Sequence, residues 1–352
     1  LLDRIGEGTF ATVYEVFNFE DGKKYACKVV KNKFYNNFEN DRKINNLKNE
    51  LVILMNMNHP AILKFMGFNS INFDNLPNPV IFAELAVNRS LESILQLERN
   101  GLASEFWTDT KKLINIYGIA SGMSYIHSQN IIHRNLKPSN ILIDGLIHPK
   151  LGDFGLSKII GDDANDEDKN QKILLGTYAY IAPEIYENKE YSKASDVYAF
   201  SLIVYEIITN KKPVFGSTFY QIMMNVTKGF RPEIKDDIPD CYKKLIQDCW
   251  SPDPSKRPTF DDILKLLRTD KRFITENVKQ VEYYDYVHKI DKLQSNFDHK
   301  VLQIIDYESI YQKQKVVLIT DGFLRLTNFI KMDKIARDNY SVTYRVIEKG
   351  KS

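Results

Sequence analysis

The first thirty residues contain two β-prone runs joined by a tight-turn signal, and this feature constrains the fold more than any other. Val13–Phe17 and Tyr25–Val30 are rich in β-branched and aromatic residues, and Asp21-Gly22 lies between them. Asp-Gly between two such runs is a strong signal for a β-hairpin. The chain is therefore expected to begin with antiparallel β structure.

Helical spacing dominates the rest of the chain. Apolar residues with this spacing come first at Ile44, Leu47, Leu51 and Leu54. Asn58-His59-Pro60 then ends the run, and helical spacing returns near Asp109. Val197–Ile208 is apolar almost all round, which is typical of a helix buried in the middle of a lobe. The pattern predicts an α+β fold class: a small β-rich N-terminal lobe with one main helix, and a larger α-helical C-terminal lobe.

Composition excludes several classes of protein. The 352 residues are 43% hydrophobic and 27% charged, as in globular proteins, and 48 basic against 46 acidic residues leave a net charge of +2. This balance gives no reason to expect a nucleic-acid partner. No apolar run approaches the roughly 18 to 20 residues that span a membrane. Three cysteines, Cys27, Cys241 and Cys249, are too few for a disulfide framework, so an intracellular, cytoplasmic location is expected.

Two features of the β-rich start are suited to binding phosphate. Ile5-Gly6-Glu7-Gly8 is a glycine-rich turn, and glycines there let backbone N–H groups approach phosphate oxygens, although an ordinary hairpin turn has the same composition. Lys28 lies inside an apolar strand and needs a counter-charge. Glu50, three residues after Leu47, lies at the edge of the buried helical stripe and could supply that charge.

A further set of motifs occurs in a fixed order. Residues 131–143 read Ile-Ile-His-Arg-Asn-Leu-Lys-Pro-Ser-Asn-Ile-Leu-Ile, and Asp153-Phe154-Gly155 and Ala182-Pro183-Glu184 follow. With the glycine-rich turn and Lys28, these motifs resemble those of the eukaryotic protein kinases. The resemblance covers residues 1–268 and implies the bilobal kinase fold, with an N-lobe over about 1–83, a hinge over 84–88 and a C-lobe over 89–268.

The resemblance also implies a site for ATP and Mg²⁺ and a protein partner, either a Ser/Thr substrate or a regulated protein, in intracellular signalling. The implied ATP-binding residues are Ile5, Gly6, Gly8, Val13, Ala26, Lys28, Ala83, Glu84, Ala86, Leu142 and Asp153. Asn140 and Asp153 would hold Mg²⁺, Glu50 would orient Lys28, and Lys137 is similar to the catalytic-loop lysine of Ser/Thr kinases.

Other implied features are structural. Glu184 and Arg257 would form an ion pair, Asp196 would fix the backbone of the catalytic loop, and Thr177 would contact that loop. The run Cys249-Trp250-Ser251-Pro252-Asp253-Pro254, with Arg257-Pro258, is typical of the tyrosine-kinase-like group of Ser/Thr kinases.

The main departure from the family pattern is Asn135, which stands where the family has its catalytic aspartate. An amide is neutral and essentially non-basic, so it cannot accept the proton of a substrate hydroxyl. Loss of a general base is worth roughly 10² to 10⁴ in rate, or about 3 to 5 kcal/mol. Two functions remain open: a phosphotransferase with impaired catalysis, and a pseudokinase that acts as a docking or allosteric module. Asn135 is either a natural substitution or an engineered one.

A second departure lies in the segment after Asp153. No Ser, Thr or Tyr occurs between Ser157 and Thr177, and five of the seven residues from Asp162 to Asp168 are acidic. The acidic run is either a solvated loop or a mimic of a phosphate that pairs with Arg134.

The last eighty residues carry no catalytic motif. Residues 269–332 are interpreted as a linker or tail of unknown fold, with a helical candidate over Val278, Val281, Tyr284, Val287 and Ile290 and a hairpin signal, Asp321-Gly322, within Val316–Leu326. Residues 333–346 match residues 3–16 at an offset of 330, with four identities in fourteen positions. Either this similarity is accidental, or residues 333–352 begin a second, degenerate kinase-like domain.

Overall fold

The computed structural model describes residues 2–7, 11–19, 21–31, 39–69, 71–74, 76, 78–160, 177–188, 190–295, 332–337 and 342–346. The chain divides into two compact units. The first is built on Leu1–Met57 and Leu63–Ala86, and the second on Asn58–Ile62 and Val87–Leu302. Gly8, the acidic run Asp162–Asp168 and the hairpin signal in Val316–Leu326 lie outside the described residues.

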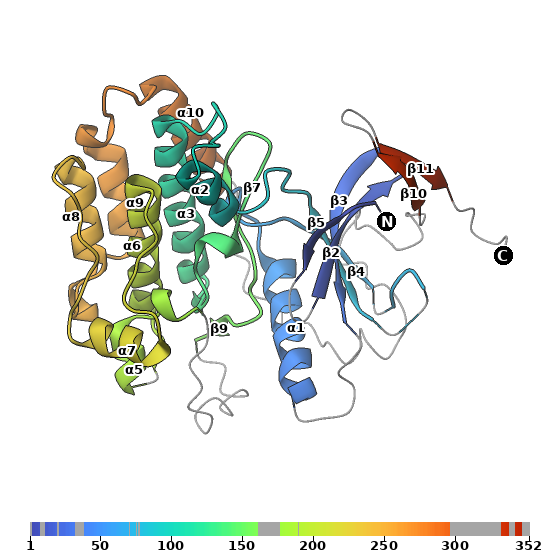
Figure 1. Ribbon diagram of the computed structural model, residues 1–352, viewed down its shortest axis with the longest axis horizontal. Helices are drawn as coiled ribbons and strands as arrows, with labels where there is room; N and C mark the ends of the chain where they lie inside the picture. Colours follow the sequence, from blue (N-terminus) through green and yellow to red (C-terminus); the bar gives the residue numbers. More distant parts are fainter. Residues whose placement is uncertain are drawn as a thin grey trace. The chain divides into compact units, whose positions relative to one another are not determined.

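The first unit is a five-stranded antiparallel sheet with one helix beside it (Figure 1). Its strands, in the spatial order β1-β2-β3-β5-β4, are β1 (Arg4–Glu7), β2 (Ala11–Asn18), β3 (Lys23–Val30), β4 (Phe65–Asn69) and β5 (Val80–Glu84), and its helix is α1 (Glu39–Asn56). The predicted hairpin is confirmed as β2 and β3, with Gly22 in the turn at φ +67°. Glycine adopts this left-handed conformation without a steric penalty.

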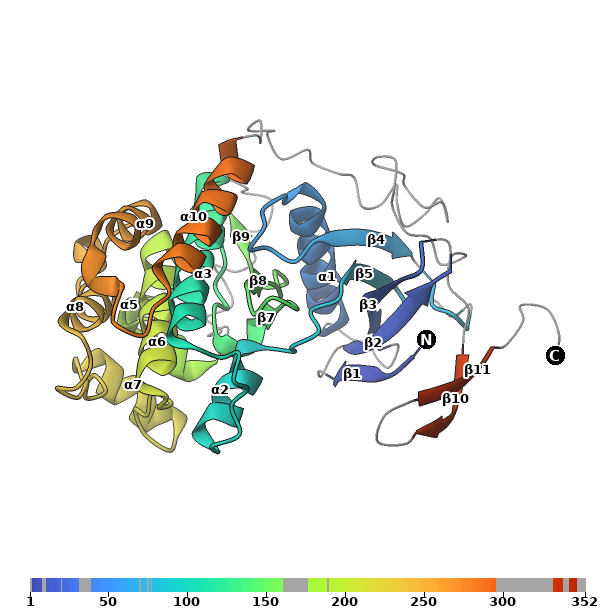
Figure 2. The ribbon, with the colours of Figure 1, turned by 90° about the horizontal axis from the view of Figure 1, so that it is seen from above.

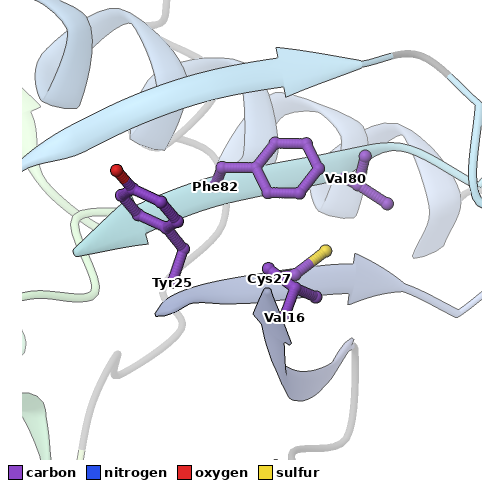
Figure 3. Close-up of a cluster of buried hydrophobic side chains, with 5 residues drawn as sticks. All are labelled: Val16, Tyr25, Cys27, Val80 and Phe82. Carbon is purple, nitrogen blue, oxygen red and sulfur yellow. The ribbon is translucent and has the colours of Figure 1, made fainter. Parts of the chain in front are cut away.

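The pleat of this sheet separates its residues into two faces. Side chains alternate along a strand, so cross-strand partners share a face. One face carries a hydrophobic cluster from β2, β3 and β5, consisting of Val16, Tyr25, Cys27, Val80 and Phe82, whose side chains gather together in Figure 3. The opposite face therefore carries the alternate residues, which include Val13, Ala26, Lys28 and Ala83.

The second unit is mainly helical, with two short antiparallel strand pairs (Figure 1). Its helices are α2 (Leu91–Arg99), α3 (Asp109–Ser128), α5 (Pro183–Asn188), α6 (Lys193–Thr209), α7 (Phe219–Thr227), α8 (Asp240–Cys249), α9 (Phe260–Thr269) and α10 (Gln280–Ser295). Its strand pairs are β6 (Ile131–Ile132) with β9 (Lys158–Ile159), and β7 (Ile141–Ile143) with β8 (Pro149–Leu151). The expected central helix is confirmed as α6, which is buried from Ser195 to Ile207. A β-rich unit with one helix and a helical unit together confirm the predicted α+β division.

Asn58–Ile62 belongs to the second unit, although the sequence placed it in the N-terminal lobe. The reason is its hydrogen bonding. Leu151 N donates to Ala61 O at 2.7 Å, and Ile62 forms a bridge with the same strand. Gly122 of α3 permits this approach, because a Cβ there would lie 2.6 Å from Leu151 Cδ1 and 3.3 Å from Ala61 O.

Helix α10 packs along α3, and Figure 2 shows it beside α3. It is joined to α9 by hydrogen bonds from Tyr283 to Leu267 O and from Arg268 to Asp291. Its buried side chains are Tyr283, Tyr286, Val287 and Ile290. Gly118 of α3 makes room for them, because a Cβ there would lie 2.6 Å from Pro149 Cγ and closer still to the hydroxyl of Tyr286. The proposed tail therefore includes a helix that completes the core of the second unit.

Candidate active site

In the first unit, an ion pair joins the sheet to helix α1. Lys28 Nζ lies 2.7 Å from Glu50 Oε1 and 2.5 Å from Oε2, which confirms the predicted partner of Lys28. The Glu50 side chain is 9% exposed and that of Lys28 is 31% exposed. A buried carboxylate would be costly without a partner, so the pair fixes the lysine against the helix. The ammonium group is thereby held on the sheet face that also carries Val13 and Ala26.

The register of the sheet brings several of the other expected ATP-binding residues together. Val13 pairs with Lys28, and Ala26 pairs with Ala83. Because Ala26 and Ala83 have small side chains, this part of the sheet face leaves room for a flat aromatic ring to pack against it. The sequence alone does not predict this register of the strands.

The structure also gives the positions of the other ATP-binding residues expected in the first unit. Gly6 pairs with Val13 in β1 and β2, and Ile5 beside it is 41% exposed. Glu84 ends β5, where its backbone N–H donates to Lys64 O and its side chain accepts from Lys64 N at 2.8 Å. Ala86 is the last residue of its segment in the first unit.

In the second unit, Asp196 holds the loop that follows β6. Its carboxylate accepts hydrogen bonds from His133 N at 2.8 Å and Arg134 N at 3.0 Å, and it contacts His127 Nε2 at 2.9 Å. This confirms the expectation that Asp196 fixes the backbone of this loop. Arg134 has φ +63°, a conformation that is unfavourable for a non-glycine residue and needs such support.

Asn135 lies at the centre of the site and contacts the expected metal ligands. Its Nδ2 donates to Asp153 Oδ2 at 3.0 Å, and its carbonyl accepts from Asn140 Nδ2 at 2.7 Å. Asn140 O in turn accepts from Gly152 N, next to Asp153, at 3.0 Å. Asn135 is buried, and its Oδ1 has no hydrogen-bond partner among the described residues. The structure therefore brings Asn135, Asn140 and Asp153 together.

Lys137 and Thr177 complete this part of the site. Lys137 Nζ donates to Thr177 Oγ1 at 2.8 Å, which confirms the predicted contact of Thr177 with the loop. A pocket is lined by both residues and by Asn135, Tyr180, Ile181 and Ile185, among others. Leu142 lies on β7, where it forms a bridge with Ser90.

The donor atoms in the second unit fit Mg²⁺. This ion prefers oxygen ligands and usually takes one or two carboxylates together with substrate phosphates and water. Asp153 supplies a carboxylate, and the orientation of Asn140 makes its oxygen the atom with which it can bind a cation. Asp153 has φ +61°, a strained conformation of the kind that clusters at functional sites.

The predicted ion pair between Glu184 and Arg257 is confirmed in the second unit. Arg257 Nη1 and Nη2 donate to the two carboxylate oxygens at 2.7 and 2.8 Å, and its Nε donates to Ser251 O at 2.9 Å. Such a two-pronged pair holds α5 in place.

One polar cluster at the site was not expected from the sequence. Glu206 of α6 accepts from the hydroxyl of Tyr180 and from Arg99 Nη1, the latter at 3.4 Å. Burial raises the pKa of Glu206, and it raises the pKa of Tyr180 as well. The three residues are far apart in the sequence and form no local pattern, so sequence reasoning offered no signal for them.

Comparisons with known proteins agree with this geometry. Residues 1–267 match the protein kinase domain family. A serine/threonine-protein kinase/receptor of Acanthamoeba polyphaga mimivirus is 32% identical over 267 residues, which cover 75% of this chain and 15% of that protein. A serine/threonine-protein kinase of Dictyostelium discoideum is 33% identical over 265 residues, 75% of this chain and 27% of that protein.

A dual specificity protein kinase of Dictyostelium discoideum is 31% identical over 286 residues, which cover 80% of this chain and 19% of that protein. The chain thus spans between 15% and 27% of the length of these three relatives. With the family matched over most of its residues, the chain belongs to the protein kinase domain family and has its bilobal fold.

Proposed function

We propose that this chain binds Mg-ATP and transfers the terminal phosphate slowly to serine or threonine side chains of a partner protein. The observation that carries the proposal is the set of hydrogen bonds that joins Asn135, Asn140 and Asp153. The loop that would hold the metal and the acceptor is assembled, and an amide occupies the position of the base.

Each residue has a separate role in this proposal. Lys28, held by Glu50, binds phosphate oxygens, and Lys137 stabilises the charge of the group in transfer. Mg²⁺ bound by Asn140 and Asp153 neutralises phosphate charge. Oδ1 of Asn135 accepts a hydrogen bond from the acceptor hydroxyl and orients it but cannot remove its proton. Since the transition state of phosphoryl transfer is loose, the acceptor hydroxyl keeps its proton until late and loses it to an oxygen of the transferred phosphate or to water, while ADP leaves. Positioning thus sustains a slow reaction, about 10² to 10⁴ below that with a base.

A pseudokinase is the second candidate function, and the same residue favours it. The hydrogen bond from Asn135 to Asp153 needs no cation, whereas two carboxylates in these positions would repel each other. The loop therefore has a stable structure without metal or nucleotide. As a pseudokinase, the domain docks onto a partner protein or regulates it without transferring phosphate.

Two finer assignments belong to the proposal. Membership of the tyrosine-kinase-like group rests on the run from Cys249 to Pro254, in which Trp250 O accepts from the Arg231 guanidinium at 3.1 and 3.2 Å. An intracellular, cytoplasmic setting is supported by three free, buried thiols, Cys27, Cys241 and Cys249. Among the described helices, none has the length and apolar character needed to cross a membrane.

The test compares the chain with Asn135→Asp. Mg-ATP binding is measured by calorimetry, and phosphate transfer is measured with radiolabelled ATP and a generic Ser/Thr protein substrate. We expect both proteins to bind Mg-ATP, the variant more tightly because the bound cation relieves the repulsion between two carboxylates, and we expect transfer to rise by about 10² or more in the variant. Asn100→Asp is the matched control, because it adds the same charge at an exposed helix end, and Lys28→Met reports background activity.

The outcomes separate the two candidates. ATP binding with no transfer in either protein would favour the pseudokinase. Absence of ATP binding in both would overturn the proposal and leave a kinase-shaped scaffold.

A further inference from the structure

Two strands lie outside the residues that match the kinase family. β10 (Met332–Arg337) and β11 (Val342–Val346) pair in an antiparallel sheet of their own. A two-stranded hairpin is at best marginally stable in water, and a stable sheet needs further strands or a packed helix. The described part of the chain shows no third strand beside this pair. Such a hairpin therefore needs further structure to pack against if it is to be stable.

The register of this hairpin repeats that of β1 and β2 at the offset of 330 residues. In the first hairpin, Arg4 pairs with Tyr14, Gly6 with Val13 and Glu7 with Thr12. In the second hairpin, the pairs at the same offset are Lys334 with Tyr344, Ala336 with Thr343 and Arg337 with Val342. Each of these three pairs of the first hairpin thus has its counterpart in the second.

The two hairpins also share an irregularity. The register of the first shifts between Arg4 and Gly6, and that of the second shifts between Lys334 and Ala336, again at an offset of 330. A bulge inserts one residue on one strand, and bulges are retained within families because they set the twist and the aim of the strand. An accidental hairpin would need the same pairing and the same bulge on the same strand.

The sequence agrees with the backbone over the same residues. Asp333, Ile335, Tyr344 and Val346 are identical to Asp3, Ile5, Tyr14 and Val16. Gly6 is replaced by Ala336, which the hairpin tolerates, because a Cβ on Gly6 would lie 3.5 Å from Val13 Cβ, an ordinary contact. In the sequence, Gly8 is replaced by Asp338, so the position equivalent to the second glycine of the glycine-rich motif carries a negative charge, which would repel phosphate.

We propose that residues 332–346 are the first hairpin of a second kinase-like lobe. This lobe has the kinase fold but does not bind nucleotide. The lobe needs a strand equivalent to β3, a helix equivalent to α1, and strands equivalent to β4 and β5. Its loss of nucleotide binding rests on the proposed function of the glycine-rich turn in the first lobe.

The first experiment reads the transcript beyond the codon for Ser352. The position equivalent to Lys28, 330 residues further along the chain, lies six residues beyond Ser352. We expect a β-prone run near that position, then an amphipathic helix and two further strands, in a stretch that matches the kinase family again. A stop codon in these residues, or a stretch without that order of elements, would overturn the proposal.

The second experiment uses the polypeptide of the complete reading frame. Limited proteolysis with mass spectrometry should give two protected fragments, one ending after α10 and one starting near β10. A fluorescent ATP analogue should bind at one site per chain, and Lys28→Met should abolish this binding. Two sites, or one site that survives Lys28→Met, would contradict the loss of nucleotide in the second lobe. If no analogue binds to either protein, the proposed function of the first lobe fails, whereas the fragments still decide the duplication.

Discussion

Nδ2 of Asn135 donates a hydrogen bond to Oδ2 of Asp153 at 3.0 Å, which joins the loop after β6 to the segment after β8. The bond is between a neutral amide and a carboxylate, and hydrogen bonds to charged groups contribute about 1.5 to 3 kcal/mol. Its donor exists only because residue 135 is an amide. The amide at position 135 therefore stabilises the contact between these two segments without a metal ion.

The first prediction follows from this bond. Asn135→Asp should lower the unfolding temperature in EDTA, because the variant loses the donor and brings two carboxylates together. Mg-ATP should raise the unfolding temperature of the variant more than that of the unchanged chain, because a cation relieves the repulsion. Differential scanning fluorimetry measures both effects, and Asn100→Asp serves as the control. Equal shifts in the two proteins would show that Asn135 and Asp153 are not coupled.

The second prediction concerns the ion pair of Lys28 and Glu50. Lys28→Met leaves a carboxylate that is 9% exposed without its partner, and we expect a loss of about 3 kcal/mol in the free energy of unfolding. Glu50→Gln leaves an amide oxygen that can still accept from Lys28, so the loss should be about 1 kcal/mol.

An exposed pair on the same sheet is the matched control for this asymmetry. Lys24 Nζ lies 2.7 Å from Glu15 Oε1, and the lysine side chain is 56% exposed. Lys24→Met should cost less than about 1 kcal/mol, as exposed pairs do. Denaturant unfolding measures the three variants, and a similar loss for Lys28→Met and Lys24→Met would refute the argument from burial.

Features set by local patterns were predictable from the sequence. The β2–β3 hairpin follows from Asp21-Gly22, and the partner of Lys28 follows from the position of Glu50 on the apolar stripe of its helix. Contacts between distant segments were not predictable in this way. The bond from Asn135 to Asp153 and the cluster around Glu206 depend on how loops are brought together, and no spacing along the chain encodes them.

Helix α10 shows why the tail was interpreted incompletely. The apolar residues expected on this helix recur every three positions. Because an α-helix has 3.6 residues per turn, side chains with this spacing do not stay on one face of the helix. The predicted helix is confirmed, and Val287 and Ile290 are buried on it as expected, as is Val278 just before it, whereas Val281 is 75% exposed. The residues that are buried include two tyrosines, and a buried tyrosine usually has a hydrogen-bond partner for its hydroxyl. For Tyr283 that partner is Leu267 O at 2.9 Å, which only the packing against α9 reveals.

The third prediction tests α10 as part of the core. Tyr283 is fully buried, so Tyr283→Ala should lower the free energy of unfolding by about 3 to 5 kcal/mol. Val281→Ala, two residues away on the exposed face, should change it by less than about 0.5 kcal/mol. Urea denaturation followed by circular dichroism measures both. If the two variants are equally stable, α10 is not packed on the second unit.

The fourth prediction is a dependence of stability on pH that arises from His59. Its Nδ1 accepts from Ala61 N at 3.1 Å, and its Nε2 lies 3.2 Å from Ser121 Oγ. The ring is therefore neutral and carries its proton on Nε2. Burial lowers the pKa of His59 from 6.5 to about 3.

The sign of the effect follows from this shift in pKa. Above pH 6.5 the ring is neutral in the folded and the unfolded chain, so the full stability is present. As the pH falls from 6.5 toward 3, only the unfolded chain binds the proton, and the stability is progressively lost. At pH 5 the loss is about 2 kcal/mol, and it is insensitive to the exact folded pKa because that value lies well below 5.

His59→Gln removes this titration and should therefore reduce the difference in unfolding free energy between pH 7.5 and pH 5 by about 2 kcal/mol. The variant will be less stable at pH 7.5, since it loses buried contacts, so the quantity to compare is the change with pH and not the absolute value. His288 is exposed, and His288→Gln should leave the dependence on pH unchanged. Denaturant unfolding at both pH values measures all three proteins. An equal dependence on pH in the chain and in His59→Gln would show that His59 gains its proton without loss of the fold.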